Sequence, residues 1–194
     1  MKTTILKISF IFLFLSLMGA GCQREEEEIF ELQIGDKNAV IQKEVDGVEF
    51  KFGLLNENGE PATVFREGEN FTFHFSVKNN TTQDLFFDRN VLLNSEFCTV
   101  YAMENNKRIG TPFEGKYLYL IGRGAFQLVQ GGIDSFEVPW EDNRDEWSHS
   151  SISFNSTHQK PLSKGSYYTG FTHQFNFENV KTKALTFKIT FEIK

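Results

Sequence analysis

The residue best suited to covalent chemistry in this chain is Cys22, because of what precedes it. Lys2 and Lys7 lie before an apolar run over residues 8–18, and Gly19-Ala20-Gly21 follow that run. A positive segment, a short apolar core and a small-residue stretch make up a cleaved export signal, and the apolar run is too short to span a bilayer. The pattern therefore predicts that the thiol of Cys22 becomes available for modification at a cleavage site.

The segment Leu17-Met18-Gly19-Ala20-Gly21-Cys22 resembles the lipobox of bacterial lipoproteins. The resemblance implies residues 1–21 as signal peptide, diacylation of Cys22, and attachment to the membrane through that lipid. Cleavage by ordinary signal peptidase without lipidation is the alternative. The acidic run that completes residues 22–28 is similar to the signal that sends some lipoproteins to the cell surface; a solvated tether is the simpler interpretation. We therefore expect a cell-envelope, outer-membrane lipoprotein that is surface-exposed.

The second cysteine, Cys98, lies in the apolar stretch Phe97-Cys98-Thr99-Val100-Tyr101. Such surroundings predict a buried, unreactive thiol rather than a nucleophile. With Cys22 lipidated, no intramolecular disulfide can form. Residues 29–194 must therefore be stabilised as one domain by their apolar core.

Histidines are the next candidates for chemistry. His74 falls on the polar side of an alternating strand, and His149 and His158 fall in the polar segment 141–161, so we expect these three side chains to be solvated. His173 shares the face of Phe171 and Phe175, which predicts a structural histidine at the rim or in the interior of the domain.

Acidic residues crowd the segment Glu141-Asp142-Asn143-Arg144-Asp145-Glu146. Oxygen-rich loops can bind calcium, but the spacing matches no EF-hand, and Arg144 can neutralise its neighbours locally. We expect a solvated loop, with calcium binding as the alternative. No metal ligand and no cofactor is assigned.

Motifs of common enzymes are missing from the sequence. It contains no H-E-x-x-H, no G-x-S-x-G, no phosphate-binding loop and no paired C-x-x-C. Lys and Arg number 20 against 26 Asp and Glu, a formal charge of -6, which argues against nucleic acid as a partner. We therefore expect no catalytic residue.

Two tyrosines, Tyr117 and Tyr119, form the most suggestive binding pattern. In a strand over residues 117–121 they share one face, while Leu118 and Leu120 share the other. If the leucines are core, the tyrosines face outward, where they suit a sugar ring or a protein partner. A half-covered sheet face is the alternative.

The elements that must position these residues are strands. Apolar and polar residues alternate over 48–54, 71–77 and 185–194, the period of a strand with one buried face. Turn residues separate these runs, and no amphipathic helix is predicted. Further strands are expected at residues 29–34, 84–93, 97–103, 117–121, 125–129, 135–140 and 167–177. The pattern predicts an all-β, antiparallel two-sheet sandwich.

Three segments carry a resemblance to the immunoglobulin-like intracellular proteinase inhibitor (BsuPI-type) domain. They are Phe71 to Thr81, with its Asn79-Asn80 turn, Gly132 to Trp140, and Leu162-Ser163-Lys164-Gly165-Ser166-Tyr167. The last is similar to a tyrosine corner, in which the hydroxyl of Tyr167 bonds to backbone upstream. The resemblance implies an immunoglobulin-like sandwich over about residues 48–194.

Two functions follow as expectations. The first is a non-catalytic lipoprotein that binds a protein or a glycan, or serves as a structural module. The second, from the resemblance, is a peptidase inhibitor that inserts an exposed loop, for which residues 105–116 and 141–161 are long enough. A binding module should show an exposed aromatic or concave face, and an inhibitor a protruding ordered loop.

Overall fold

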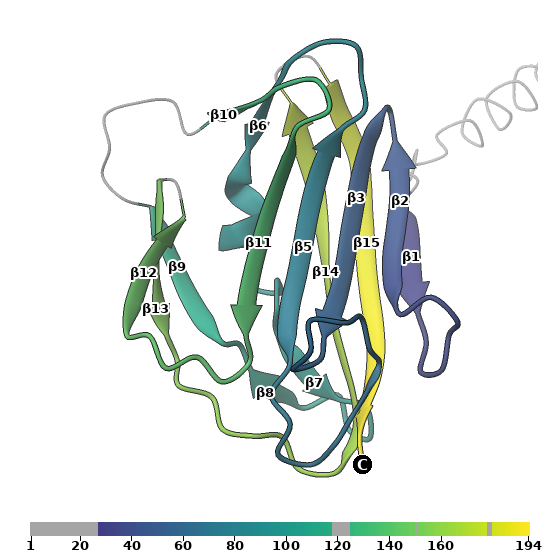
Figure 1. The fold of residues 1–194 in the computed structure, drawn as a ribbon, viewed down its shortest axis with the longest axis vertical. Helices are drawn as coiled ribbons and strands as arrows, with labels where there is room; N and C mark the ends of the chain where they lie inside the picture. The colour runs from purple at the N-terminus through teal and green to yellow at the C-terminus, as the bar shows by residue number, and fades with distance from the viewer. Residues whose placement is uncertain (1–26, 118–124, 150, 178–179) are drawn as a thin grey trace, which may run out of the picture.

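The computed structural model describes residues 27–117, 125–149, 151–177 and 180–194, and nearly all of its regular elements are strands (Figure 1). A single 3-10 helix, η1 (Arg89–Leu93), is described among them. The strands are β1 (Glu28–Leu32), β2 (Val40–Val45), β3 (Val48–Leu55), β4 (Val64–Phe65), β5 (Thr72–Asn79), β6 (Leu85–Asp88), β7 (Val100–Ala102), β8 (Arg108–Gly110), β9 (Phe113–Tyr117), β10 (Ala125–Leu128), β11 (Ile133–Pro139), β12 (Glu146–His149), β13 (Ile152–Ser156), β14 (Gly165–Phe177) and β15 (Val180–Ile193).

Two sheets face each other and form the body of the molecule (Figure 1). One sheet has the order β11-β5-β3-β2, and the other has the order β1-β15-β14-β6-β10. β7 also pairs with β14 and carries β8, while β4 pairs with β15. The pairings are antiparallel except for two short strands, β1 and β4, which run parallel to β15. The predicted all-β sandwich is confirmed.

Phenylalanine rings fill the space between the two sheets. Phe50 of β3 packs on Phe175 of β14 with ring centroids 4.6 Å apart, and Phe187 of β15 contacts both. All three side chains are fully buried. The alternation over 48–54, 71–77 and 185–193 therefore arises because every second residue enters this core.

The expected tyrosine corner is present at the start of β14. The hydroxyl of Tyr167 donates to the carbonyl oxygen of Ser163 at 2.8 Å, and its ring packs on Phe191. Tyr168, the next residue, points to the opposite, outer face. This corner is a feature of immunoglobulin-like sandwiches, so the expectation of that fold is borne out in its detail.

A third, smaller sheet of order β12-β13-β9 stands beside the sandwich next to β11 (Figure 1). We call it the side sheet. Its inner face carries Phe113 and Phe154, whose rings lie 5.5 Å and 5.4 Å from that of Phe136 on β11. The segment 141–161, predicted as a polar loop, thus contains two strands. The inner face of these two strands consists of Trp147, Ile152 and Phe154. Polar residues surround these three in the sequence, so the segment shows no clear strand pattern.

Two other predicted strands are shorter than expected. The strand predicted over 84–93 ends at Asp88, because its carboxylate accepts a hydrogen bond from the backbone N–H of Asn90 and caps η1. The strand predicted over 97–103 spans only β7, since Cys98 has a φ of 59° in the preceding turn. β1 begins at Glu28, one residue before the expected start of the domain.

In the described ranges no helix is long and apolar enough to cross a membrane.

Candidate ligand-binding groove

The ligand residues predicted from the sequence lie only partly within the described structure. Tyr117 is the last residue of β9, and its backbone pairs with Ile152 of β13. Its side chain, Tyr119, and the lipidation site Cys22 lie outside the described residues. Of the strand predicted over 117–121, only the backbone of Tyr117 is described, as the last residue of β9, so the predicted facing of Tyr117 and Tyr119 stays a prediction.

A groove runs along the same strand. It lies between β9, β8 and the end of η1 with the loop that follows, and has a volume of about 330 Å³. Its floor is apolar, and its rim carries polar and charged side chains. The floor residues are Leu92, Leu93, Phe97 and Phe113, and the rim residues are Asn94, Ser95, Arg108, Thr111, Glu114 and Lys116.

One wall of the groove is the unpaired edge of β9. β9 is the outer strand of the side sheet and pairs only with β13 among the described strands. The backbone N–H of Thr157 donates to the carbonyl of Pro112 at 3.1 Å, which makes these two residues a hydrogen-bonded pair. Bonded and non-bonded pairs alternate along an antiparallel ladder, so Glu114 and Lys116 also bond to β13.

Phe113 and Gly115 consequently direct their backbone groups away from β13. A second observation agrees: the N–H of Ser156, the residue opposite Phe113, donates instead to Asp145 on the β12 side at 3.0 Å. Gly115 lies tightly against its surroundings, since a Cβ there would come within 3.1 Å of Leu93 and Phe154. The close approach of η1 to β9 therefore needs a glycine at this position.

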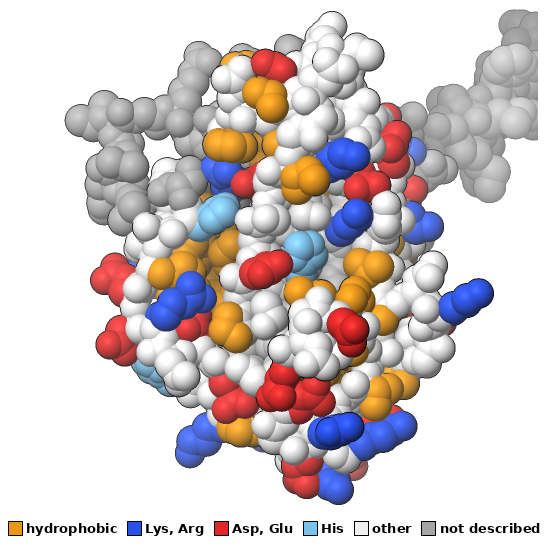
Figure 2. Space-filling model, viewed as in Figure 1, with side chains coloured by type: hydrophobic (Ala, Val, Ile, Leu, Met, Phe, Trp, Pro, Cys, Tyr) orange, Lys and Arg blue, Asp and Glu red, His pale blue; other side chains and the backbone are white. Residues whose placement is uncertain are grey.

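The charges at the rim are uncompensated. Among the described residues, neither Arg108 nor Lys116 forms an ion pair, and Glu114 is the single carboxylate at the rim. In the whole chain Asp and Glu outnumber Lys and Arg, 26 to 20, and side chains of both signs are intermixed at the lower end of the face in Figure 2. The groove is thus a locally positive place on an acidic molecule.

An aromatic pair adjoins this groove on the outer face of the larger sheet. Tyr101 of β7 and Tyr168 of β14 stack with centroids 5.1 Å apart, and Lys188 lies over Tyr168. Arg108 is the cross-strand neighbour of Tyr101. Partial burial, together with the hydrogen bond to the Glu96 carboxylate, raises the pKa of Tyr101 to about 12. The pair is thus a neutral, half-exposed aromatic surface beside the groove.

His149 is only partly solvated, contrary to the prediction. It lies on β12, where its ring packs edge-on against Phe136 and its Nε2 lies 3.7 Å from Oδ1 of Asp134. Asp134 also receives two hydrogen bonds from buried Arg89, at 2.8 Å and 2.6 Å. The ring turns toward the domain because it packs on Phe136 of β11. The polar composition of 141–161 gave no indication of this contact.

This Arg89–Asp134–His149 cluster bridges η1, β11 and the side sheet. Burial opposes ionisation of Asp134, but the hydrogen bonds from Arg89 and the nearby imidazole of His149 outweigh it and lower the pKa of the carboxyl. Nη1 of Arg89 and Nε2 of His149 are buried with no hydrogen-bond partner. Their burial keeps them from any ligand in this arrangement, so we assign the cluster a structural role.

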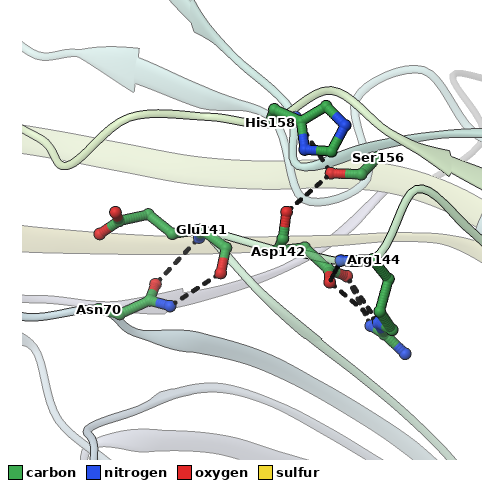
Figure 3. Close-up of polar contacts among 6 residues, drawn as sticks. All are labelled: Asn70, Glu141, Asp142, Arg144, Ser156 and His158. Atoms are coloured by element: carbon green, nitrogen blue, oxygen red, sulfur yellow. Dashed lines mark hydrogen bonds and ion pairs between the residues drawn. The ribbon is translucent and has the colours of Figure 1, made fainter.

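Hydrogen bonds within the acidic segment 141–146, and from Asn70 and Ser156, hold it in place (Figure 3). Asp142 is buried, and both of its carboxylate oxygens accept hydrogen bonds from Arg144 at 2.6–3.0 Å. Asn70 holds the backbone of Glu141 through two bonds of 3.0 Å, and Ser156 donates to the carbonyl of Asp142. Within the described ranges, no three acidic, His or Cys side chains are grouped as metal ligands.

The remaining histidines occupy three different surroundings. His74 lies on the outer face as predicted, but it is partly buried and its Nδ1 lies 2.9 Å from Oε1 of Glu137. His158 is exposed, 3.4 Å from Asp145. His173 packs against Phe175 at 4.8 Å, and burial lowers its pKa, in agreement with a structural histidine.

Cys98 is fully buried, and burial raises the pKa of its thiol well above the ordinary value. The predicted burial of the Cys98 thiol is therefore confirmed. A buried thiol of this kind does not supply a thiolate at neutral pH.

Comparison with known proteins adds little to this description. No protein-family model and no curated protein matches the sequence. A search of solved structures returned the ASH/PapD-like domain of human CEP192 (PapD-like domain 7), with a TM-score of 0.36 and 13% sequence identity, over 76% of this chain and 85% of that one.

Proposed function

We propose that this protein is a lipid-anchored, extracytoplasmic binding module without catalytic activity, and that its protein or glycan ligand is held in the groove beside β9. One observation carries the proposal. An apolar floor, two cations without an ion pair among the described residues, and backbone groups of β9 that do not pair with β13 converge in one hollow. The anchor is the lipid on Cys22, supported by the segment Leu17 to Cys22.

Absence of catalysis is part of the proposal. The support is local: Cys98 is buried, and the side chains of His74 and His149 lie against carboxylates on the sandwich and at its edge. None of these three residues lines the groove.

Peptidase inhibition by an exposed loop has less support. The two segments long enough to enter a protease cleft, 105–116 and 141–161, contain β8, β9, β12 and β13. Their apolar side chains pack into the side sheet and onto β11. An inhibitory loop of the kind expected from the resemblance would have to protrude instead.

Membrane fractionation tests the anchor. Replacing Cys22 by Ser removes the acylated thiol, so the protein should move from the membrane fraction to the aqueous one, because acyl chains are its proposed anchor. Retention of Cys22→Ser in the membrane fraction would contradict lipidation. Protease treatment of whole cells, with and without replacement of Glu25 to Glu28 by Ser, tests surface exposure.

Affinity capture tests the binding role. The full chain in mild detergent serves as bait for envelope extracts and a glycan array, in three forms: unchanged, Arg108→Glu with Lys116→Glu, and the control Lys37→Glu. Lys37 is exposed and distant from the groove. The account expects a ligand that the double variant loses and the control keeps; a ligand that both variants keep would contradict the groove. Tyr117→Ala with Tyr119→Ala tests the predicted tyrosines in the same assay.

A further inference from the structure

The free edge of β9 limits what kind of ligand fits the groove. The backbone N–H groups of Phe113 and Gly115 and the carbonyl of Gly115 face the groove, while the carbonyl of Phe113 accepts a long hydrogen bond from the hydroxyl of Thr111 at 3.4 Å. Residues two apart in a strand are spaced by about 6.6 Å. An extended polypeptide repeats its own N–H and C=O groups at the same interval. A sugar chain or a lipid has no such repeat.

The groove also offers what an added strand needs besides hydrogen bonds. Its floor is apolar: Leu93 is partly exposed, and the buried rings of Phe97 and Phe113 also line it. Such a floor suits the apolar side chains on one face of an extended segment. The opposite wall is β8 and the residue Thr111, so the segment would be held on both sides. One face of the added strand would then be buried and the other exposed.

Charge indicates the composition of the partner. Among the residues that the structure describes, Arg108 and Lys116 form no ion pair, and they share the rim of the groove with one carboxylate, that of Glu114. The formal charge of the whole chain is -6, so this local excess of positive charge is opposite in sign to the molecule. An acidic peptide would be attracted to the groove and not to its surroundings.

We infer that the groove binds an extended, acidic segment of a partner protein by strand addition to the free edge of β9. The inference rests on the proposed binding function and names the class of ligand. The bound segment would become a fourth strand of the side sheet, with carboxylates near Arg108 and Lys116 and small or apolar side chains on the floor.

Selection from a displayed library of random ten-residue peptides, with the full chain in detergent as target, tests this directly. Enriched peptides should alternate apolar residues with Asp or Glu. Their affinity, measured by calorimetry, should fall about tenfold or more in Arg108→Glu with Lys116→Glu, while Lys37→Glu leaves it unchanged.

N-methylation of single amides in an enriched peptide separates strand addition from other modes of peptide binding. Methyl groups on alternate amides, those that face β9, should abolish binding, whereas those on the intervening amides should have little effect. Equal sensitivity at all positions would overturn strand addition, as would enriched peptides whose binding ignores the groove substitutions.

The outcome also distinguishes this inference from the proposed function. If no peptide is enriched, or none depends on the groove, while envelope capture or the glycan array yields a ligand that Arg108→Glu with Lys116→Glu loses, the groove binds a ligand of another class and strand addition is wrong. If neither experiment yields a ligand that depends on the groove, the proposed function fails as well.

Discussion

The sandwich and the side sheet use the same kinds of residues to different ends. In the sandwich, β14 and β15 pair along most of their length, and phenylalanine rings contact one another from both sheets. The side sheet has three strands of at most five residues and one apolar face, and one edge of β9 pairs with no other described strand. The sandwich thus concentrates buried contacts, while the side sheet keeps backbone groups of β9 available for a partner.

Removal of a buried aromatic ring should have the largest effect, and the effect should differ between the sandwich and the side sheet. Phe187→Ala should destabilise the whole domain by about 3–5 kcal/mol, because it leaves a cavity between the sheets. Phe154→Ala, at an equally buried position in the side sheet, should mainly expose the amides of β12 and β13. Urea unfolding followed by hydrogen exchange measures both; equal loss of protection across the molecule in the two variants would contradict the comparison.

The Arg89–Asp134–His149 cluster joins the two regions, so breaking it should come next in effect. Arg89→Met leaves the Asp134 carboxylate buried without its partner, which should cost about 3 kcal/mol at pH 7. The pKa of Asp134 is lowered in the folded protein, so its stabilising effect is present above roughly pH 4 and is lost as the pH falls further. Urea midpoints from pH 7 to pH 3 should therefore fall less steeply in Arg89→Met with Asp134→Leu than in the unchanged protein.

Tyr167→Phe probes the sandwich alone. Loss of the hydroxyl bond to Ser163 should lower the free energy of unfolding by about 1 kcal/mol, while the ring remains packed. Tyr168→Phe is the matched control on the outer face of the same strand. A change of the same size in both variants would show that the corner bond is not the cause.

His173 gives the sandwich a pH dependence of its own. Burial lowers its pKa, so the unfolded chain binds a proton more readily, and stability should fall as the pH drops below roughly 6.5. His173→Gln should flatten this part of the stability curve. The account would be in error if the curve between pH 7 and pH 5 kept its slope in the variant.

Groove substitutions should have the smallest effect on stability. Arg108 and Lys116 form no ion pair among the described residues, so Arg108→Glu with Lys116→Glu should change the free energy of unfolding by roughly 0.5 kcal/mol or less. Thermal unfolding of the double variant checks this. A loss of several kcal/mol would mean that the two cations support the fold and that their effect on binding is indirect.

Much of the sandwich could be predicted because alternation is a local property. The core faces of β3, β5 and β15 follow directly from residues that alternate in polarity, and the same alternation puts Tyr167, but not Tyr168, on the core face of β14. β12 and β13 escaped prediction because Trp147, Ile152 and Phe154 are isolated among polar neighbours. Their burial depends on Phe136, a contact that no local pattern encodes.

The groove itself could not be predicted for a related reason. Its residues come from η1, β8 and β9. The sequence predicted a strand over 84–93, where the structure has η1 in the second half. Gly115 and Lys116 directly precede the predicted tyrosine strand, so the predicted site lies next to the groove. The sequence did not predict that one edge of β9 lines it. Whether an edge is free depends on which strands pair, and pairing is decided by the whole fold.

Residue-resolved hydrogen exchange of β9 tests the central claim most directly. In the free protein the amide of Gly115 should exchange rapidly, while those of Glu114 and Lys116, which bond to β13, should be protected. Addition of a selected acidic peptide should protect Gly115 and leave β14 and β15 unchanged. A Gly115 amide that is already protected in the free protein, or that still exchanges rapidly with the peptide bound, would contradict the account.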